Sequence, residues 1–381
     1  MTHPTLLSPN THESADQPLG SSHGVPGSAN AGGLPLAALQ AWLEPRVPGI
    51  GRDLSAQKID GGQSNPTWIL RGAQGAWVLR AKPAPAATLM PSAHAIEREF
   101  QVLAALQGSG VPVPRVRVLC EDESVIGVAF YLMDFVEGRV LRDVTLSDLP
   151  LQERAAYFDA MTDTLVALHQ TPWRSVGLQD FGRLDGYFSR MIHRWSKQYR
   201  ASTQQPSQAM EQLMAWLPKH LPTDADSAQH TCISHGDFRM ENLIFHPTQP
   251  RVVAVLDWEL STLGHPLADL SYNCMTWHLP TGILRGLDGL DIAALGLPSQ
   301  RSYVQRYCEA TGRDFAALEP DWPFYLAFNL FRLSAILQGI AHRHSLGLAA
   351  SASAAEVGAM AQPIAERGWA IASGAIGAFA H

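Results

Sequence analysis

The strongest constraint in this sequence is a stretch of polar residues and short apolar runs over residues 232–270. It contains an HGD triplet that ends at Asp237, an asparagine at Asn242, and an aspartate at Asp257. Two apolar runs, LIF and VVAVL, follow Asn242 and precede Asp257, and a Gln-Pro pair typical of turns separates them. The pattern predicts a β-hairpin, and folding it brings Asp237, Asn242 and Asp257 to one end.

Phosphoryl transfer requires side chains of these types. Its transition state is loose, so the protein mainly positions the reactants and neutralises charge. We predict that Asp237 accepts or orients the proton of an attacking hydroxyl, and that the oxygens of Asn242 and Asp257 bind Mg²⁺. The spacing from Asp237 to Asn242 equals that of the protein-kinase catalytic loop, and Asp257 falls where the kinase metal-binding aspartate would fall. The alternative is that the three residues only cap and shape the hairpin, but their combination at this spacing favours catalysis.

The segments HGDFRMENLIFHP and VLDWELSTLGHPLADL resemble the aminoglycoside phosphotransferase family of kinase-like enzymes. More narrowly, they are similar to the branch found alone in bacteria or fused to acyl-CoA dehydrogenases. The resemblance covers residues 36–350, and it departs at Glu241, where an aspartate is expected. It implies an α+β, bilobal protein-kinase-like fold with a small β-rich N-lobe and a larger, mainly helical C-lobe. It also implies ATP and Mg²⁺ as cofactors.

The chain divides into three predicted parts. Residues 1–33 are rich in Ser, Pro, Gly and His without a periodic apolar pattern, which predicts a disordered tail. Residues 34–135 form the predicted nucleotide-binding N-lobe, and residues 136–381 form the predicted catalytic and acceptor-binding C-lobe. Small residues over 349–380 predict a closing helix that packs on the lobe or on a second subunit.

A glycine pair marks a candidate phosphate-binding loop. Residues 58–70 predict two strands joined by a turn at Gly61 and Gly62. The glycines remove side chains where a backbone can approach phosphates, and Ser64 can donate to them. A plain hairpin turn is the alternative, and the family's phosphate-covering loop at this position favours nucleotide binding.

The next strand carries two cations. Arg80 and Lys82 share one face of the strand predicted over residues 76–82. Kinase-like folds place a cation here to hold the nucleotide phosphates, paired with a carboxylate from a helix. By resemblance, Arg80 matches the family position in the V-L-R pattern, with Lys82 as the alternative. The resemblance also implies that Glu99, in the helix predicted over residues 95–107, is the partner of Arg80.

The link between the lobes resembles the family's hinge. It is the apolar run over residues 128–138, which ends in Gly138. The resemblance implies that the adenine hydrogen-bonds to the backbone near Met133 and Phe135, in an apolar slot. Gly138 would let the chain turn into the second lobe.

Several polar residues after the hairpin have open roles. Asp269, in a Gly-x-Pro-x-x-Asp turn like that of the family, is predicted to cap a helix and steady the catalytic loop. Arg332, Gln338 and Arg343 interrupt an apolar helix predicted over residues 322–344. They either bind a carboxylate, thioester or phosphate of the acceptor, or they form the polar edge of a helix bundle.

The composition limits the partners. The chain has 28 Lys and Arg against 35 Asp and Glu, a net charge of −7, and no basic run, which argues against nucleic acid. Its 4 cysteines form no Cys-x-x-Cys pair, as is typical of reduced cytosolic thiols. We recognise neither a secretory signal nor a membrane-length apolar run. We therefore expect a soluble, cytoplasmic monomer or homodimer with no membrane partner.

These patterns favour an ATP- and Mg²⁺-dependent kinase that phosphorylates the hydroxyl of a small molecule. Resemblance to the acyl-CoA-dehydrogenase-associated branch implies a hydroxylated acyl acceptor, such as a hydroxyacyl-CoA, and a functional link to an acyl-CoA dehydrogenase. The alternatives are a kinase for aminoglycosides or small amino alcohols, a catalytically silent nucleotide-binding regulator, and a metal-dependent phosphohydrolase. The hydrolase explains the glycine turn and the strand cation poorly.

Overall fold

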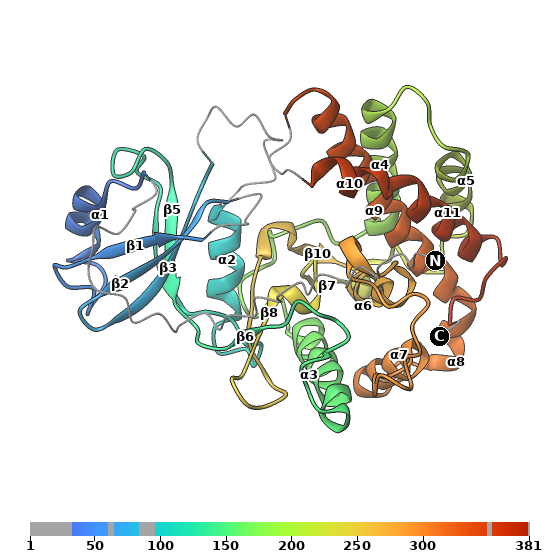
Figure 1. Ribbon diagram of the computed structural model, residues 1–381, viewed down its shortest axis with the longest axis horizontal. Coiled ribbons are helices and arrows are strands. Elements are labelled where there is room, and N and C mark those ends of the chain that lie inside the picture. Colours follow the sequence, from blue (N-terminus) through green and yellow to red (C-terminus); the bar gives the residue numbers. More distant parts are fainter. Residues whose placement is uncertain (1–32, 60–64, 84–95, 349–352, 380–381) are drawn as a thin grey trace, which may run out of the picture.

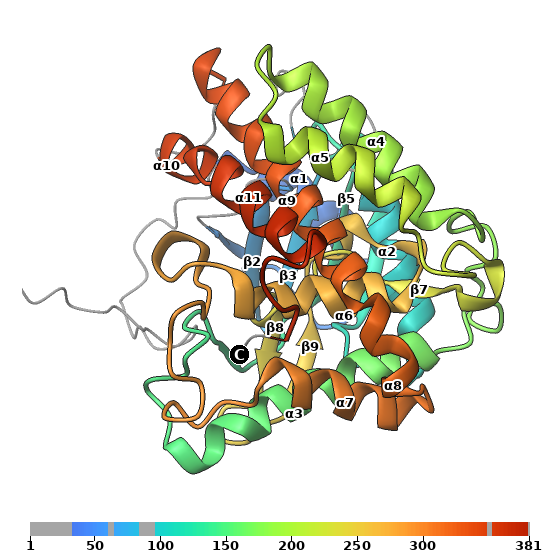
Figure 2. The same ribbon diagram turned by 90° about the vertical axis from the view of Figure 1, so that its right-hand side faces the viewer.

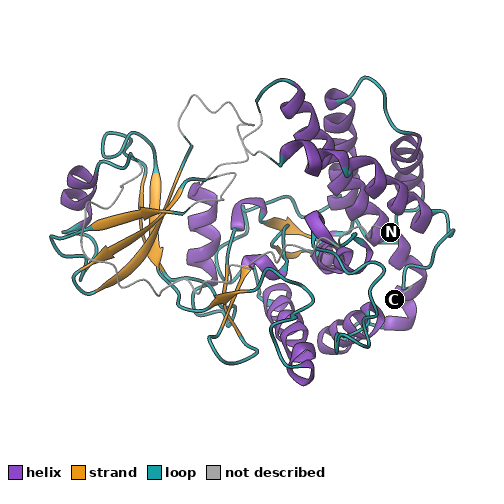
Figure 3. Ribbon diagram, in the orientation of Figure 1, coloured by secondary structure: helices purple, strands orange, loops and turns teal. Residues whose placement is uncertain are grey.

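The computed structural model describes residues 33–59, 65–83, 96–348 and 353–379 of the 381-residue chain. A β-sheet lobe and a larger, mainly helical lobe lie side by side (Figures 1 and 3). The predicted α+β, bilobal fold is therefore confirmed.

The N-lobe is built on one antiparallel sheet with the strand order β1-β2-β3-β5-β4. The strands are β1 (Ser55–Lys58), β2 (Thr67–Gly72), β3 (Gly75–Ala81), β4 (Val116–Cys120) and β5 (Phe130–Asp134). Two helices, α1 (Leu36–Leu43) and α2 (Ile96–Leu106), accompany the sheet. Helix α2 lies on the face of the sheet that is turned toward the C-lobe (Figure 1).

Strand β5 has apolar side chains on both faces of the sheet, and one of the two helices covers each face. Phe130 and Leu132 point into a core shared with α1, whereas Tyr131 and Met133 point into the core shared with α2 and the C-lobe. Alternate side chains of a strand face opposite sides of the sheet, so a strand covered on both faces is apolar throughout. This explains why the run from Phe130 to Met133 contains no charged residue.

The C-lobe consists of helices around a small catalytic β-region. The helices are α3 (Leu151–Gln170), α4 (Tyr187–Ser202), α5 (Gln208–Trp216), α6 (Pro266–Cys274), α7 (Gln300–Thr311), α8 (Phe315–Leu318), α9 (Trp322–Ser345), α10 (Ala354–Ala359) and α11 (Ala361–Ala372). Helix α9 runs through the lobe with α4, α5, α6, α10 and α11 packed around it (Figure 2). Among the described helices, only the segment Phe315–Ser345 is long and apolar enough to cross a membrane, and 72% of its apolar window is buried inside the structure.

The closing helix predicted over residues 349–380 is not continuous in the part of the chain that the structure describes. It is divided at Met360 into α10 and α11. Pro363 gives the physical reason, because a proline inside a continuous helix would lose one hydrogen bond and clash with the preceding turn. The break places Pro363 in the first turn of α11, where proline is tolerated.

The predicted hairpin is confirmed. Strands β8 (Leu243–Phe245) and β9 (Val252–Val255) pair antiparallel, with β6 (Arg139–Val140) added along β8. A second pair, β7 (Cys232–Ser234) and β10 (Thr262–Gly264), flanks the loop that carries Asp237. The link between the lobes thus runs directly into the catalytic β-region.

At Gly138 this link passes close to the hairpin. A Cβ atom at this position would lie 2.3 Å from the carbonyl oxygen of Phe245 and 2.4 Å from Cγ2 of Ile244. We expect Gly138→Ala to lower the free energy of unfolding by about 1–3 kcal/mol, because β6 must move away from β8. Thermal unfolding measures the loss. The control is Gly339→Ala in α9, where an added Cβ makes only ordinary contacts at 3.7 Å and improves helix propensity. Equal stability of the two variants would contradict the expectation.

Candidate active site

The hairpin brings the predicted polar residues together. Asn242 ends the short 3₁₀ turn η3 (Met240–Asn242) just before β8, and Asp257 follows β9. The amide of Leu256 donates to the carbonyl oxygen of Asn242 at 2.8 Å, so the two ends of the hairpin are hydrogen-bonded. Asp237 lies in the loop before η3, as the strand pattern predicts.

Asn242 connects directly to Asp237. Its Nδ2 donates to both the carbonyl oxygen and Oδ2 of Asp237, each at 2.9 Å. Because both partners are acceptors, the nitrogen must face them, and the orientation of the carboxamide is determined. Oδ1 of Asn242 is then left as an oxygen ligand for a hard cation.

Two further donors reach the carboxylate of Asp237, and sequence reasoning missed both. The hydroxyl of Tyr272 donates to Oδ1 at 2.5 Å, and Nε of Arg239 lies 3.4 Å from the same oxygen. Burial and the nearby Asp237 raise the pKa of Tyr272, so its hydroxyl stays a donor at neutral pH. Arg239 stands two residues after Asp237 and could have been noticed, whereas Tyr272 comes from α6 and has no local signal.

The loop that carries Asp237 is held by Asp269 through backbone contacts. The amide nitrogens of His235 and Gly236 lie 2.5 and 2.8 Å from its two carboxylate oxygens. Burial alone would raise the pKa of Asp269, but its contacts with His169, His235 and the Gly236 amide hold it below its usual range. Asp269 therefore stays charged inside the lobe.

The predicted helix cap at Asp269 is wrong. His265 is the N-cap of α6, and its Nδ1 accepts from the amide of Leu267 at 3.2 Å. Pro266 then occupies the first helical position, which places Asp269 one turn further on, facing the catalytic loop.

Gly236 needs both its small size and its backbone conformation. Its φ is +83°, and a Cβ atom would lie 2.6 Å from the carbonyl oxygen of Leu260. The neighbouring His235 is fully buried, its Nε2 lying 2.9 Å from the carbonyl oxygen of Leu256 and its Nδ1 accepting from the Asp237 amide at 3.2 Å. The ring of His235 thus connects the amide of Asp237 to the carbonyl group of Leu256, at the end of the hairpin.

Arg80 joins the two lobes. Its Nε lies 3.0 Å from Oε2 of Glu99, and its Nη2 lies 3.1 Å from Oδ1 of Asp257. The pair that the sequence predicts is thus in contact, and it reaches the end of the hairpin. Burial alone would lower the pKa of Arg80, but Glu99, Tyr131 and Asp257 outweigh it and raise the value.

Glu99 is only 1% exposed and is surrounded by donors. Besides Arg80, its carboxylate accepts from Nδ2 of Asn65 at 2.5 Å and from the hydroxyl of Tyr131 at 2.9 Å. Burial raises the pKa of Glu99, and Arg80 and Tyr131 oppose this shift. Asn65 and Tyr131 were missed, because an asparagine beside a turn and a tyrosine in a strand are ordinary in sequence.

Lys82, the alternative to Arg80, pairs with Glu97 instead. The side chains of Lys82 and Glu97 are 35% and 31% exposed, whereas that of Arg80 is 14% exposed. The buried contact with the hairpin favours Arg80 over Lys82 as the cation of the site.

The predicted nucleotide contacts are described only in part. Gly61, Gly62 and Ser64 lie outside the described residues. Met133 lies in β5 between Val78 of β3 and Val116 of β4. The Phe135 amide donates to the Ala76 carbonyl oxygen at 3.2 Å, so this amide is engaged within the N-lobe. The adenine contact itself stays a prediction.

Asp257 has the properties of a metal ligand. Its φ of +65° is in the left-handed region, which aspartate tolerates better than most residues and which often occurs at functional sites. The side chain is 35% exposed, and its Oδ1 contacts Arg80. In the described part of the chain, no group of three or more His, Cys, Asp or Glu is arranged to hold a metal ion. The side-chain oxygens of Asn242 and Asp257 are hard ligands of the type that suits Mg²⁺, which takes its other ligands from phosphates and water.

The three residues of α9 whose role the sequence leaves open have different surroundings. Nη2 of Arg332 donates to the carbonyl oxygen of Gly236 at 2.6 Å, and Nε2 of Gln338 donates to that of Ser202 at 3.2 Å. Arg343 is exposed near the end of the helix. Arg332 is thus part of the support of the catalytic loop, whereas Gln338 belongs to the bundle.

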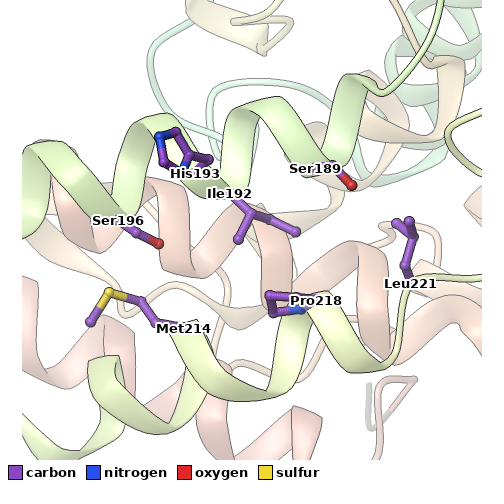
Figure 4. Close-up of a pocket in the computed structure, with 7 residues that line it drawn as sticks. All are labelled: Ser189, Ile192, His193, Ser196, Met214, Pro218 and Leu221. Atoms are coloured by element: carbon purple, nitrogen blue, oxygen red, sulfur yellow. The ribbon is translucent and has the colours of Figure 1, made fainter.

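A groove of about 220 Å³ lies between α4 and the end of α5 (Figure 4). Its lining includes His193, Met214 and Leu221. None of the predicted site residues lines this groove, so it does not contribute to the site at the hairpin.

Comparison with known proteins gives one family. A family model described as the phosphotransferase enzyme family matches residues 55–323. Acyl-CoA dehydrogenase family member 10 of Mus musculus is 45% identical over 316 residues, which is 82% of this chain and 28% of that protein. The chain therefore spans less than a third of the length of this relative.

Solved structures agree with this comparison. A candidate aminoglycoside phosphotransferase from Ralstonia eutropha JMP134 is 48% identical with a TM-score of 0.80, over 90% of this chain and 99% of that chain. Spectinomycin phosphotransferase, solved with ADP and spectinomycin, is 13% identical with a TM-score of 0.57, over 88% of this chain and 98% of that chain. The second likeness shows a shared fold only.

Proposed function

The chain belongs to the aminoglycoside phosphotransferase family, and from this premise we propose that it is an ATP- and Mg²⁺-dependent kinase for the hydroxyl group of a small molecule. One observation carries the proposal. Asp237, Asn242 and Asp257 gather at one end of the catalytic hairpin, and Arg80 connects that end to the N-lobe. A base, two cation ligands and a phosphate-binding cation are the parts that phosphoryl transfer needs.

Asp237 acts on the acceptor. It accepts the proton of the acceptor hydroxyl while the hydroxyl oxygen forms a bond with the γ-phosphorus of ATP. The bond between that phosphorus and the bridging oxygen breaks, and ADP leaves. Hydrogen bonds from Tyr272 and Asn242 hold the carboxylate in one orientation, which suits a role in aligning the hydroxyl.

The nucleotide side rests on residues from both lobes. Arg80, held by Glu99, orders the phosphates. The family resemblance assigns Gly61, Gly62 and Ser64 to the loop that covers them. Oδ1 of Asn242 and the carboxylate of Asp257 hold Mg²⁺, which neutralises phosphate charge when it is bound.

The adenine binds at the backbone near Met133 and Phe135. The ADP bound by the spectinomycin enzyme supports the choice of nucleotide through the shared fold.

The acceptor is a hydroxylated acyl compound such as a hydroxyacyl-CoA. The support is the 45% identity with a region of an acyl-CoA dehydrogenase family member, which suggests a functional link to such a dehydrogenase. The 48% identity with the candidate aminoglycoside phosphotransferase favours an aminoglycoside or amino-alcohol acceptor as the alternative. We place the activity in the cytoplasm, in a soluble monomer or homodimer.

A panel of acceptors tests this assignment. We expect ADP release from Mg-ATP to require a short-chain hydroxyacyl-CoA, with the position of its hydroxyl deciding the rate. The matched control is the same acyl-CoA without the hydroxyl, which should release no ADP above the rate with water. Release with kanamycin or choline alone would establish the alternative acceptor class. Nucleotide binding without transfer to any acceptor would favour the silent regulator.

A further inference from the structure

Two residues outside the catalytic hairpin contact the loop that carries Asp237. Tyr272 comes from α6 and Arg332 comes from α9. Neither belongs to the motif that carries Asp237, Asn242 and Asp257. Both nevertheless contact the Gly236-Asp237 segment directly.

Tyr272 holds one oxygen of the base. Its hydroxyl lies 2.5 Å from Oδ1 of Asp237, whereas Asn242 donates to Oδ2. The two donors bind different oxygens of the Asp237 carboxylate, so the carboxylate cannot rotate without losing one hydrogen bond. Arg239, at 3.4 Å and half exposed, holds the carboxylate less firmly.

Arg332 holds the backbone beside the base. It is 6% exposed, and its Nη2 donates to the carbonyl oxygen of Gly236 at 2.6 Å. Its guanidinium also lies 5.0 Å from the ring centre of Tyr272 and 5.9 Å from that of Trp195. One side chain thus contacts both the catalytic loop and the tyrosine that orients Asp237.

Helix α9, which carries Arg332, is itself hydrogen-bonded to α6. Asn329, three residues before Arg332 and on the same face, donates to the carbonyl oxygen of Ala268 at 2.9 Å and to Oγ of Ser271 at 2.7 Å. Both acceptors belong to α6, the helix of Tyr272. α9 therefore sets the position of α6 and of the catalytic loop together.

We propose that Tyr272 and Arg332 are positioning residues, which hold Asp237 in the orientation that meets the acceptor hydroxyl. The proposal rests on the proposed function. Phosphoryl transfer depends mainly on alignment, and small misplacements of a reacting group are costly. Loss of a single hydrogen bond to a charged group lowers the rate about 10- to 100-fold when that bond is needed for alignment.

Intrinsic ATP hydrolysis tests the role of Tyr272, because water then takes the place of the acceptor. We expect Tyr272→Phe to lower kcat for ADP release about 10- to 100-fold, with the KM for Mg-ATP within about twofold of the wild type. The matched control is Tyr303→Phe, the same deletion at a buried tyrosine of α7, which should leave both parameters unchanged.

Arg332 is tested by a graded pair. Arg332→Met removes the donor and should lower kcat as Tyr272→Phe does, whereas Arg332→Lys keeps a donor and should restore part of the loss. Equal losses in the Lys and Met variants would overturn the role of Arg332. Equal losses in Tyr272→Phe and Tyr303→Phe would overturn the role of Tyr272.

Hydrogen exchange separates this proposal from the proposed function. The amides of residues 235–237 should exchange faster in Tyr272→Phe and Arg332→Met than in Tyr303→Phe, whether or not the protein hydrolyses ATP. Unchanged exchange would overturn the positioning role. If the wild-type protein neither releases ADP nor binds nucleotide, the proposed kinase function is overturned. The hydrogen-exchange result then still decides whether Tyr272 and Arg332 position the loop.

Discussion

Asp237→Asn is expected to abolish phosphoryl transfer while Mg-ATP still binds. The amide cannot take the proton of the acceptor, and it places an NH₂ group among the donors that now serve the carboxylate. A base contributes about 10²- to 10⁴-fold to such reactions, so kcat should fall by that factor. Asn242 and Asp257 are unchanged, and the Kd for Mg-ATP should stay within a few-fold. Steady-state ADP release and calorimetric titration measure the two quantities.

The control for this variant is Asp163→Asn. Asp163 lies on the exposed side of α3, where it pairs with Arg306 at 2.8 Å, away from the hairpin. Its replacement makes the same chemical change and should leave both kcat and Kd unchanged. A variant of Asp237 that keeps its turnover but loses its affinity for ATP would contradict the role of the base and move Asp237 to the nucleotide site.

Asp257→Asn should remove the stabilisation of the protein by Mg-ATP. A ligand at 100 times its Kd adds about 2.7 kcal/mol to the free energy of unfolding. For a large domain this raises the Tm by several degrees, at roughly 2–4 °C per kcal/mol. The substitution removes a charged metal ligand and weakens the contact with Arg80, so the shift should be lost. Thermal unfolding with Mg-ATP, with ATP and EDTA, and without nucleotide measures it.

Asparagine is the better replacement here because of the backbone. Asp257 has a φ of +65°, and asparagine tolerates the left-handed region as aspartate does, whereas alanine would add strain. Asp224 supplies the matched control, since it also has a left-handed backbone, with a φ of +59°, and is exposed on the surface. Asp224→Asn should keep the full shift. A shift that persists in Asp257→Asn would remove Asp257 from the metal site.

The strands and helices of this protein follow from local patterns. The helix predicted over residues 95–107 is α2, and the two apolar runs after Asn242 form the predicted hairpin. Such elements depend on neighbours a few positions away, through helical or alternating periodicity. The family motif also predicts the pair of Arg80 and Glu99, which the structure brings into contact.

The start of α6 was harder to predict, because two nearby residues can each act as the helix cap. His265 caps α6 although Asp269 is the commoner type of capping residue. The adjacent Pro266 favours a helix start at that position, and Asp269 is drawn to the catalytic loop by two backbone amides. The residues of the turn alone do not show whether the carboxylate of Asp269 caps the helix or binds the amides of the catalytic loop.

The sequence by itself therefore determined the hairpin and the three polar residues at its end, and its resemblance to the family implied the bilobal fold. Only the tertiary structure decided which side chains support them. Tyr272 reaches Asp237 across 35 residues, Arg332 reaches Gly236 across 96, and Arg80 reaches Asp257 across 177. Periodicity and spacing carry information about neighbours along the chain. Contacts between distant segments depend instead on how α6, α9 and the two lobes pack, which no local pattern contains.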